Sequence, residues 1–355
     1  MQTPRGYSHL HLAHPTLSRL PREFLGDYPT PVQRRRDGPL RLWIKRDDLS
    51  HPIYGGNKLR KLEYLLGQAI SRGHRSVVTF GAAGSNHALA TAVHAAGLGL
   101  SCLCILGPQP PSPAVRRTLN AHLALGTTLV PWERRRSQRL DLYRRLFRGP
   151  GPAHRPWIIP IGGSTWHGTV GFVNAAYELA RQVRDGELPE PALIYLPLGT
   201  MGTVAGLATG LAATGLGTRV VAVRVVVEKI ADERRTRRLG AKTAELLHRL
   251  DPGFPALDPG DLNLEVRDEF LGEGYAVPTP AARRAVDWAA RHAGLRLETT
   301  YSGKALSALL ADADAGRLDR REVLFWNTYN SAPLAMPDDH PIREGLPGPL
   351  ARYFS

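Results

Sequence analysis

A lysine follows two glycines and an asparagine in the segment YGGNKLRKLEY, which begins at Tyr54. Apolar side chains recur after it at helical spacing, so Lys58 is predicted to lie in the first turn of an amphipathic helix. The positive end of a helix dipole disfavours an ammonium, which helps the amine to act as a nucleophile toward a carbonyl carbon. The glycines would let the backbone approach a flat ring closely. The segment alone leaves two interpretations open, a Schiff-base lysine or a turn followed by an exposed lysine.

Two further turns could bind anionic groups. In GAAGSNHALATA a predicted strand ends and a helix starts at Ser85-Asn86, where free backbone N–H groups could bind carboxylate or phosphate; an ordinary N-cap is the alternative. His87, in the same turn, is more typical of a surface residue than of a catalyst. The second turn follows the apolar strand LIYLPL and consists of Gly199, Thr200, Met201, Gly202 and Thr203.

The second turn brings backbone N–H groups and two hydroxyls to the start of a helix. It lacks the Lys-Ser/Thr ending of a nucleotide P-loop, and GxGxxG is absent. These features favour one phosphate on a small cofactor over ATP or NAD, and a tight strand-to-helix turn is the alternative. In LETTYSGKALSALL, Tyr301 and Ser302 precede a predicted helix that carries Lys304, and unaided they resemble an N-cap region. The glycine-rich stretch IPIGGSTWHGTVGF is a weaker candidate.

Strands alternate with helices along the chain. Apolar strands are predicted at 76–81, 100–107, 191–199 and 219–227, and amphipathic helices follow most of them. This alternation predicts parallel sheets covered by helices on both faces. Two groups, at about 76–160 and 191–330, indicate two α/β units joined by the connector RRLFRGPGPAHRPW.

Composition narrows the function classes. The net charge is +14, but the short arginine runs are scattered and no aromatic pattern accompanies them, so nucleic-acid binding is disfavoured and an anionic ligand is favoured. No apolar run is long enough to span a bilayer, and the N-terminus lacks an apolar signal core. Cys102 and Cys104 lie two residues apart in a predicted strand and are poorly placed for a disulfide with each other. We therefore expect a cytoplasmic protein without a metal site or membrane partner.

Taken together, these motifs resemble the pyridoxal-phosphate (PLP) enzymes of the tryptophan-synthase-β fold type (fold type II). Within them the sequence is similar to the 1-aminocyclopropane-1-carboxylate deaminase/D-cysteine desulfhydrase family. The motifs IKRDDLSHPIYGGNKLRKLEYLL, SNH, IPIGGSTWHGTVGF, GTMGTVAGL, GYAVP and YSGKAL occur in the family's order. The resemblance implies two parallel-sheet α/β domains, a large PLP-binding domain from 1–60 and 171–355 and a smaller one from 61–170. It also implies a homodimer.

The resemblance implies a role for each matched position. Lys58 would form the Schiff base with PLP and then remove the substrate's Cα proton. Asn86 would contact the pyridoxal 3-oxygen, and Ser85 and His87 would lie near the substrate carboxylate. The remaining assignments follow the same order: the turn at 199–203 would hold the phosphate, Tyr275 and Tyr301 would line the substrate site, and Ser302 would be the partner of the pyridine nitrogen.

The sequence also departs from the family pattern. Ser302 replaces the Glu of the deaminases, and a hydroxyl would leave the ring nitrogen neutral, which suits simple β-elimination. Ala83-Gly84 replaces Ile-Gln, GPQPPSP replaces a Trp-containing motif, and residues 327–330 read NTYN instead of HTGG. We therefore expect a lyase that converts a small β-substituted amino acid, with D-cysteine first, to pyruvate and ammonia. A β-replacement synthase, a cyclopropane deaminase and a PLP-binding protein without turnover are the alternatives.

Overall fold

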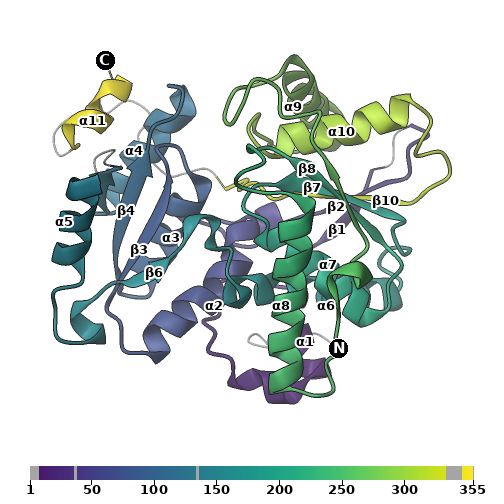
Figure 1. Ribbon diagram of the computed structural model, residues 1–355. Coiled ribbons are helices and arrows are strands. Elements are labelled where there is room, and N and C mark those ends of the chain that lie inside the picture. Colours follow the sequence, from purple (N-terminus) through teal and green to yellow (C-terminus); the bar gives the residue numbers. More distant parts are fainter. Residues whose placement is uncertain (1–7, 36–37, 133–135, 333–345, 355) are drawn as a thin grey trace. The chain divides into compact units, whose positions relative to one another are not determined.

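The computed structural model describes residues 8–35, 38–132, 136–332 and 346–354 (Figure 1). The chain divides into two compact units, and each is described by itself. Unit 1 comprises Met1–Leu20, Phe24–Lys61 and Ser164–Ala332, and unit 2 comprises Pro21–Glu23, Leu62–Gly163 and Pro333–Ser355. The helix α2 (Asn57–Ser71) contributes its first residues to unit 1 and the rest to unit 2.

Unit 1 is built on a sheet whose described strands follow the order β1-β2-β10-β7-β8-β9. Neighbouring strands are parallel except for β1 and β2, which are antiparallel. The strands are β1 (Val32–Arg34), β2 (Leu42–Lys45), β7 (Leu193–Leu198), β8 (Arg219–Arg224), β9 (Leu264–Arg267) and β10 (Val323–Trp326).

Helices cover both faces of this sheet, as Figure 1 shows. The helices are α1 (His9–Ala13), α6 (Trp166–Arg184), α7 (Gly202–Thr214), α8 (Glu233–Leu250), α9 (Pro280–Ala293) and α10 (Ser302–Asp314). Side chains of β8 alternate between the faces, because Val220 and Ala222 pack with α6 and α7, whereas Val221 and Val223 pack with α9 and α10. The near-continuous apolar strands of the sequence are explained by this burial on both sides.

Unit 2 has a smaller sheet in the order β5-β4-β3-β6, and the described pairs are all parallel. Its strands are β3 (Ser76–Ala82), β4 (Ser101–Gly107), β5 (Thr128–Pro131) and β6 (Trp157–Ile159). Its helices besides α2 are α3 (Asn86–Gly97), α4 (Pro113–Ala124), α5 (Arg136–Leu146) and α11 (Gly348–Ala351).

The sequence had placed the residues after 332 in the larger domain. In the structure the C-terminal residues 346–354 instead pack on unit 2, because Leu350 and Tyr353 are buried in its core. The Tyr353 hydroxyl also donates to the backbone oxygen of Gln109 at 3.1 Å. The junction before α6 falls at 163/164 in the structure, whereas the sequence placed it at 170/171.

The predicted fold class, two parallel-rich sheets with helices, is confirmed. The antiparallel strand β1 was not predicted, and β8 ends at Arg224, earlier than the apolar run suggested. Cys102 and Cys104 are both free thiols of β4, with their Sγ atoms 3.8 Å apart. Within the described residues, no helix combines the length and the apolar character that a membrane span requires.

Candidate functional site

Lys58 is the second residue of α2, as the sequence predicted. The turn before the helix requires glycine, because Gly56 has a φ of 95° and a β-carbon there would lie 2.9 Å from the Thr328 carbonyl oxygen. The backbone N–H of Asn57 donates to the same oxygen at 3.1 Å. The turn and the segment after β10 are therefore in direct contact.

The Lys58 amine lies in surroundings that favour its uncharged form. Burial lowers the pKa of Lys58 to about 8, and the nearby Glu298 carboxylate opposes this shift by favouring the ammonium. At neutral pH a larger share of this amine is free than for an ordinary lysine, whose pKa is about 10.4. This is the condition that a nucleophilic or proton-abstracting lysine needs.

The turn at 199–203 connects β7 to α7 and has an unusual backbone. Met201, the residue before the helix, has a φ of 72°. Residues other than glycine and asparagine rarely adopt this left-handed backbone conformation. At Gly202 a β-carbon would lie 2.9 Å from both the Lys61 Nζ and the Ser164 Oγ. Strained backbone and an obligatory glycine mark functional turns more often than simple connections.

Three polar side chains converge on this turn. Lys61 Nζ donates to Ser164 Oγ at 3.2 Å, and Ser164 Oγ donates to Thr200 Oγ1 at 2.8 Å. The backbone N–H of Gly202 also donates to Ser164 Oγ, at 3.1 Å. Lys61 is buried, and this burial, together with the charge of Lys58, brings its pKa well below the usual value. An anion bound here would restore the charge of Lys61.

The starts of α2 and α7 are joined directly. Asn57 Nδ2 donates to Thr203 Oγ1 at 3.0 Å, so the first turns of both helices lie at one place. Two helix N-termini, one buried lysine and three hydroxyls are donors suited to a phosphate dianion. The phosphate group of PLP therefore fits the residues that are present.

Lys61 and Ser164 were not assigned by sequence analysis. Lys61 follows Lys58 by three residues, which places both on one helix face, and this spacing was the available signal. Ser164 belongs to the glycine-rich stretch IPIGGSTWHGTVGF, which was noted without a role. A distance of 103 residues along the chain separates the two side chains, so their contact could not be inferred locally.

Tyr275 and Tyr301 form the pair that the sequence placed at the substrate site. Their hydroxyl oxygens lie 2.7 Å apart, and their rings meet edge to face. Burial raises the pKa of both phenols, so both are neutral donors at physiological pH. Lys304 supports the loop before Tyr275, because its buried ammonium donates to the carbonyl oxygens of Leu271 and Gly274 at 2.7 and 3.1 Å.

Ser302 is the first residue of α10, and its hydroxyl is already engaged. It accepts from the Glu298 N–H at 3.1 Å and donates to Glu298 Oε1, also at 3.1 Å. Since a hydroxyl has one proton, the remaining capacity of Ser302 in this arrangement is as an acceptor.

Glu298 is a second residue that the sequence did not single out. Its carboxylate accepts from the backbone N–H groups of Thr300, Tyr301 and Ser302 at 2.7, 2.9 and 2.8 Å. It therefore caps α10 and places a negative charge close enough to act on Lys58. Its position four residues before Ser302 was a weak signal, because many helices begin after a carboxylate.

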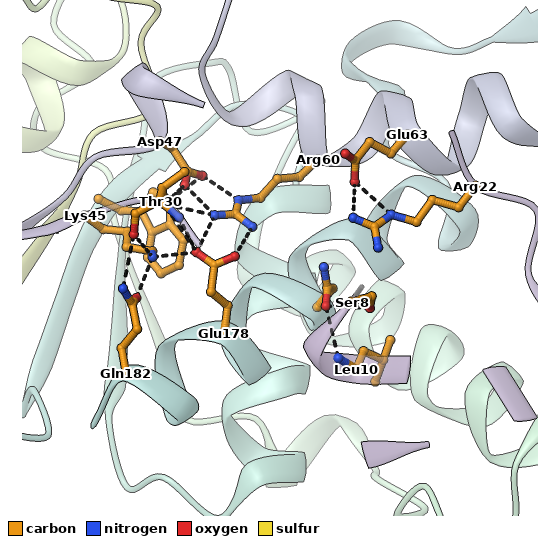
Figure 2. A network of polar contacts seen from close by, with 12 residues as sticks. Ser8, Leu10, Arg22, Thr30, Lys45, Asp47, Arg60, Glu63, Glu178 and Gln182 are labelled. Atoms are coloured by element: carbon orange, nitrogen blue, oxygen red, sulfur yellow. Dashed lines mark hydrogen bonds and ion pairs between the residues drawn. The ribbon is translucent and has the colours of Figure 1, made fainter. Parts of the chain in front are cut away.

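A buried network of charges anchors the start of α2 (Figure 2). Arg60 donates to Asp47 at 2.7 Å and to both carboxylate oxygens of Glu178 at 2.9 Å. Lys45 of β2 donates to Glu178 at 2.6 Å, and Trp326 of β10 donates to Asp47 at 2.7 Å. Two cations and two carboxylates thus compensate one another and hold α2 to β2, β10 and α6.

Ser85, Asn86 and His87 belong to unit 2. Ser85 is the N-cap of α3, and its hydroxyl accepts from the Ala88 N–H at 3.2 Å, which is the ordinary capping role. His87 is buried rather than on the surface, and its Nε2 lies 3.0 Å from the Thr79 hydroxyl. Its surface placement in the sequence analysis was wrong, because helix position alone does not report tertiary packing.

Two departures from the family pattern contact each other in unit 2. The Gly84 N–H donates to Gln109 Oε1 at 2.9 Å, and Gln109 belongs to the segment GPQPPSP. A β-carbon at Gly84 would lie 2.8 Å from the Gln109 side chain. The two sequence changes are therefore structurally linked.

Comparison with known proteins identifies the class to which this site belongs. Residues 24–328 match the family described as "Pyridoxal-phosphate dependent enzyme". The nocardicin C-9' epimerase of Nocardia uniformis subsp. tsuyamanensis is 34% identical over 82% of this chain and 86% of its own length. The D-cysteine desulfhydrase of Salmonella paratyphi A is 32% identical over 88% of this chain and 94% of its own length.

A solved structure agrees with these relatives. The crystal structure of an ACC deaminase homologue has a TM-score of 0.75 and 28% identity, covering 93% of this chain and 96% of that chain. The match extends over both units, and the donor set at the 199–203 turn suits the cofactor's phosphate. The chain belongs to the pyridoxal-phosphate-dependent enzymes, and within them to the 1-aminocyclopropane-1-carboxylate deaminase/D-cysteine desulfhydrase family.

Proposed function

We propose that the chain is a lyase that eliminates the β-substituent of a small amino acid, with D-cysteine as the leading substrate. The reaction converts D-cysteine and water to pyruvate, hydrogen sulfide and ammonia. PLP supplies the electron-accepting ring that makes the Cα proton acidic. The protein supplies the base, the phosphate donors and the proton donors around the leaving group.

Lys58 carries the central role in this proposal. Its amine would hold the cofactor through the aldehyde carbon, and it would serve as the base that accepts the substrate's Cα proton. The single observation behind this assignment is the place of Lys58 in the first turn of α2, where Asn57 Nδ2 donates to Thr203 Oγ1 of the 199–203 turn at 3.0 Å. Burial lowers the pKa of this lysine to about 8, which supports the assignment. An ordinary exposed lysine would be almost fully protonated at neutral pH and a poor base.

The tyrosine pair is assigned to the leaving group. One phenol of the pair can donate a proton to a departing thiolate while the other stabilises the resulting phenolate through their 2.7 Å contact. We assign Ser302 to the neutral pyridine nitrogen, to which its hydroxyl would donate the proton that Glu298 Oε1 accepts in the structure. Asn86 is assigned to the ring's 3-oxygen, and Ser85 and His87 to the substrate carboxylate.

A substrate panel tests the proposal. D-cysteine, L-cysteine, β-chloro-D-alanine and 1-aminocyclopropane-1-carboxylate would each be assayed for keto-acid and ammonia release. Lys58→Ala should abolish turnover and the covalent trapping of the cofactor by borohydride. Lys229→Ala, at an exposed lysine, should preserve both. Faster release of 2-oxobutyrate from the cyclopropane substrate than of pyruvate would identify a deaminase instead. If addition of a thiol gave a new β-substituted amino acid, the chain would be a replacement synthase. If the chain bound the cofactor and turned over none of the substrates, it would be a PLP-binding protein.

Epimerisation is a second candidate, favoured by the epimerase relative at 34% identity. Elimination and epimerisation share the removal of the Cα proton, and they differ in whether a β-substituent leaves or a proton returns on the opposite face. Chiral chromatography of each substrate after incubation in deuterated water distinguishes them. Inverted, deuterated amino acid without keto acid would favour the epimerase and contradict the lyase.

A further inference from the structure

The segment after β10 returns to the loop that leads into α2. We call residues 327–331 the clasp. Its first residue, Asn327, donates its backbone N–H to the Lys45 carbonyl oxygen at 3.0 Å, and its second, Thr328, accepts from the Asn57 N–H at 3.1 Å. The clasp thereby contacts both the strand that precedes the loop and the first residue of the helix.

Asn330 ties the clasp to the glycine turn through its side chain. Its Oδ1 accepts from the Gly55 N–H at 2.9 Å and from the Ala332 N–H at 3.1 Å. Its Nδ2 donates to the Ala332 carbonyl oxygen at 3.0 Å. The amide is buried and its orientation is fixed from both ends, so the bond to Gly55 is well defined.

The turn depends on contacts from outside itself. Gly55 and Gly56 have no side chains to pack, and glycine has the widest backbone freedom of any residue. A β-carbon at Gly55 would lie 2.7 Å from the Asp48 carbonyl oxygen, and one at Gly56 would lie 3.2 Å from Tyr329 backbone atoms. The turn is therefore fixed from two sides, by the segment from Asp47 to Ser50, which accepts from the Gly56 N–H, and by the clasp, which lies against Gly56 and accepts from the Gly55 N–H.

We propose that Asn330 is a positioning residue for Lys58, because its amide fixes the Gly55-Gly56 turn from which the lysine extends. The inference rests on the proposed role of Lys58 and deepens it. The family segment HTGG has glycine at the position of Asn330, and a glycine has no side chain to accept from Gly55. This chain therefore holds its lysine turn with a side chain of its own.

Loss of this bond should let the turn move and the Lys58 amine reach water. The variant is Asn330→Ala, which removes the acceptor for Gly55. Ser331→Ala is the matched control, because the Ser331 hydroxyl donates to Asp48 at 2.6 Å and does not touch the turn. The full chain, stripped of cofactor, is acetylated briefly at a series of pH values. Peptide mass mapping gives the extent of Lys58 acetylation at each pH, and the pKa of Lys58 follows from that profile.

We expect the Lys58 pKa to rise by a unit or more from about 8 in Asn330→Ala. Near pH 8 this change lowers acetylation of Lys58 about fivefold, since about a tenth instead of half of the amine is then unprotonated. Ser331→Ala should keep the parent profile. An unchanged profile in a folded Asn330→Ala, or an equal shift in Ser331→Ala, would overturn the inference.

Two features keep the test decisive. Should Asn330→Ala fail to fold, Asn330→Gly, which carries the family's residue, takes its place with the same expected shift. The labelling reports on the lysine turn without substrate, so it is independent of reaction type. Borohydride trapping of the cofactor on another lysine would refute the proposed role of Lys58 and leave the effect of Asn330 on the turn measurable.

Discussion

Replacement of Lys61 by methionine tests whether the 199–203 turn binds the cofactor's phosphate. Methionine keeps an unbranched side chain of similar length and removes only the ammonium. Lys61 Nζ lies 3.2 Å from Ser164 Oγ, which in turn accepts from the Gly202 N–H. A phosphate bound to the Gly202 N–H would therefore lie within reach of the lysine.

The expected magnitude follows from one charge-assisted contact. Such a bond contributes about 1.5–3 kcal/mol, which corresponds to a roughly 10- to 150-fold rise in the Kd of PLP. Burial lowers the pKa of Lys61 well below its usual value, so part of this energy is used to protonate the amine when PLP binds. The affinity of the parent chain should accordingly fall as pH rises on the alkaline side, and this dependence should weaken in Lys61→Met.

The assay compares two ligands on the cofactor-free chain. PLP and pyridoxal, which lacks the phosphate, are titrated while their visible absorbance is followed. Lys61→Met should weaken PLP binding and leave pyridoxal binding nearly unchanged. Lys242→Met, at an exposed lysine of α8, should change neither. Equal weakening of both ligands, or an unchanged Kd for PLP, would refute the assignment of Lys61 to the phosphate.

Three further predictions concern buried or interacting charges. Glu178→Gln should lower the free energy of unfolding by about 3–5 kcal/mol, because it leaves buried cations without their counter-charge. Asp185→Asn, in an exposed ion pair at the C-terminal end of the same helix, should change it by about 0.5 kcal/mol or less. Similarly small effects of both substitutions in urea unfolding would contradict the burial argument. Burial lowers the pKa of His122 to about 4, and neither of its ring nitrogens has a hydrogen-bond partner in the described part of the chain. Its contribution to stability is therefore complete above about pH 6.5 and is lost as the pH falls toward 4, at about 1.4 kcal/mol per unit, and the difference from His122→Leu should show this slope. Glu298→Gln should lower the pKa of Lys58 further, because the carboxylate favours the ammonium; a rise measured by acetylation would exclude that interaction.

The sequence by itself predicted the fold class and the position of the lysine. Apolar runs at 76–81 and 191–199 became β3 and β7, because strands buried on both faces leave a continuous apolar pattern. The Gly-Gly-Asn turn and the helical periodicity after it located Lys58 at the start of α2. These features are local, since a turn and the first turn of a helix are specified by neighbouring residues.

Other features of the site were decided only by tertiary structure. Ser164 and Lys61 meet although 103 residues separate them, and Asn330 contacts Gly55 across 275 residues. Residues 346–354 pack on unit 2 rather than on the unit that precedes them in sequence, through Leu350 and Tyr353. No local pattern specifies such contacts, because they depend on how parallel strands bring distant segments to one edge of a sheet. The lowered pKa of Lys58 has the same origin, since the desolvation that lowers it arises only once the chain has folded.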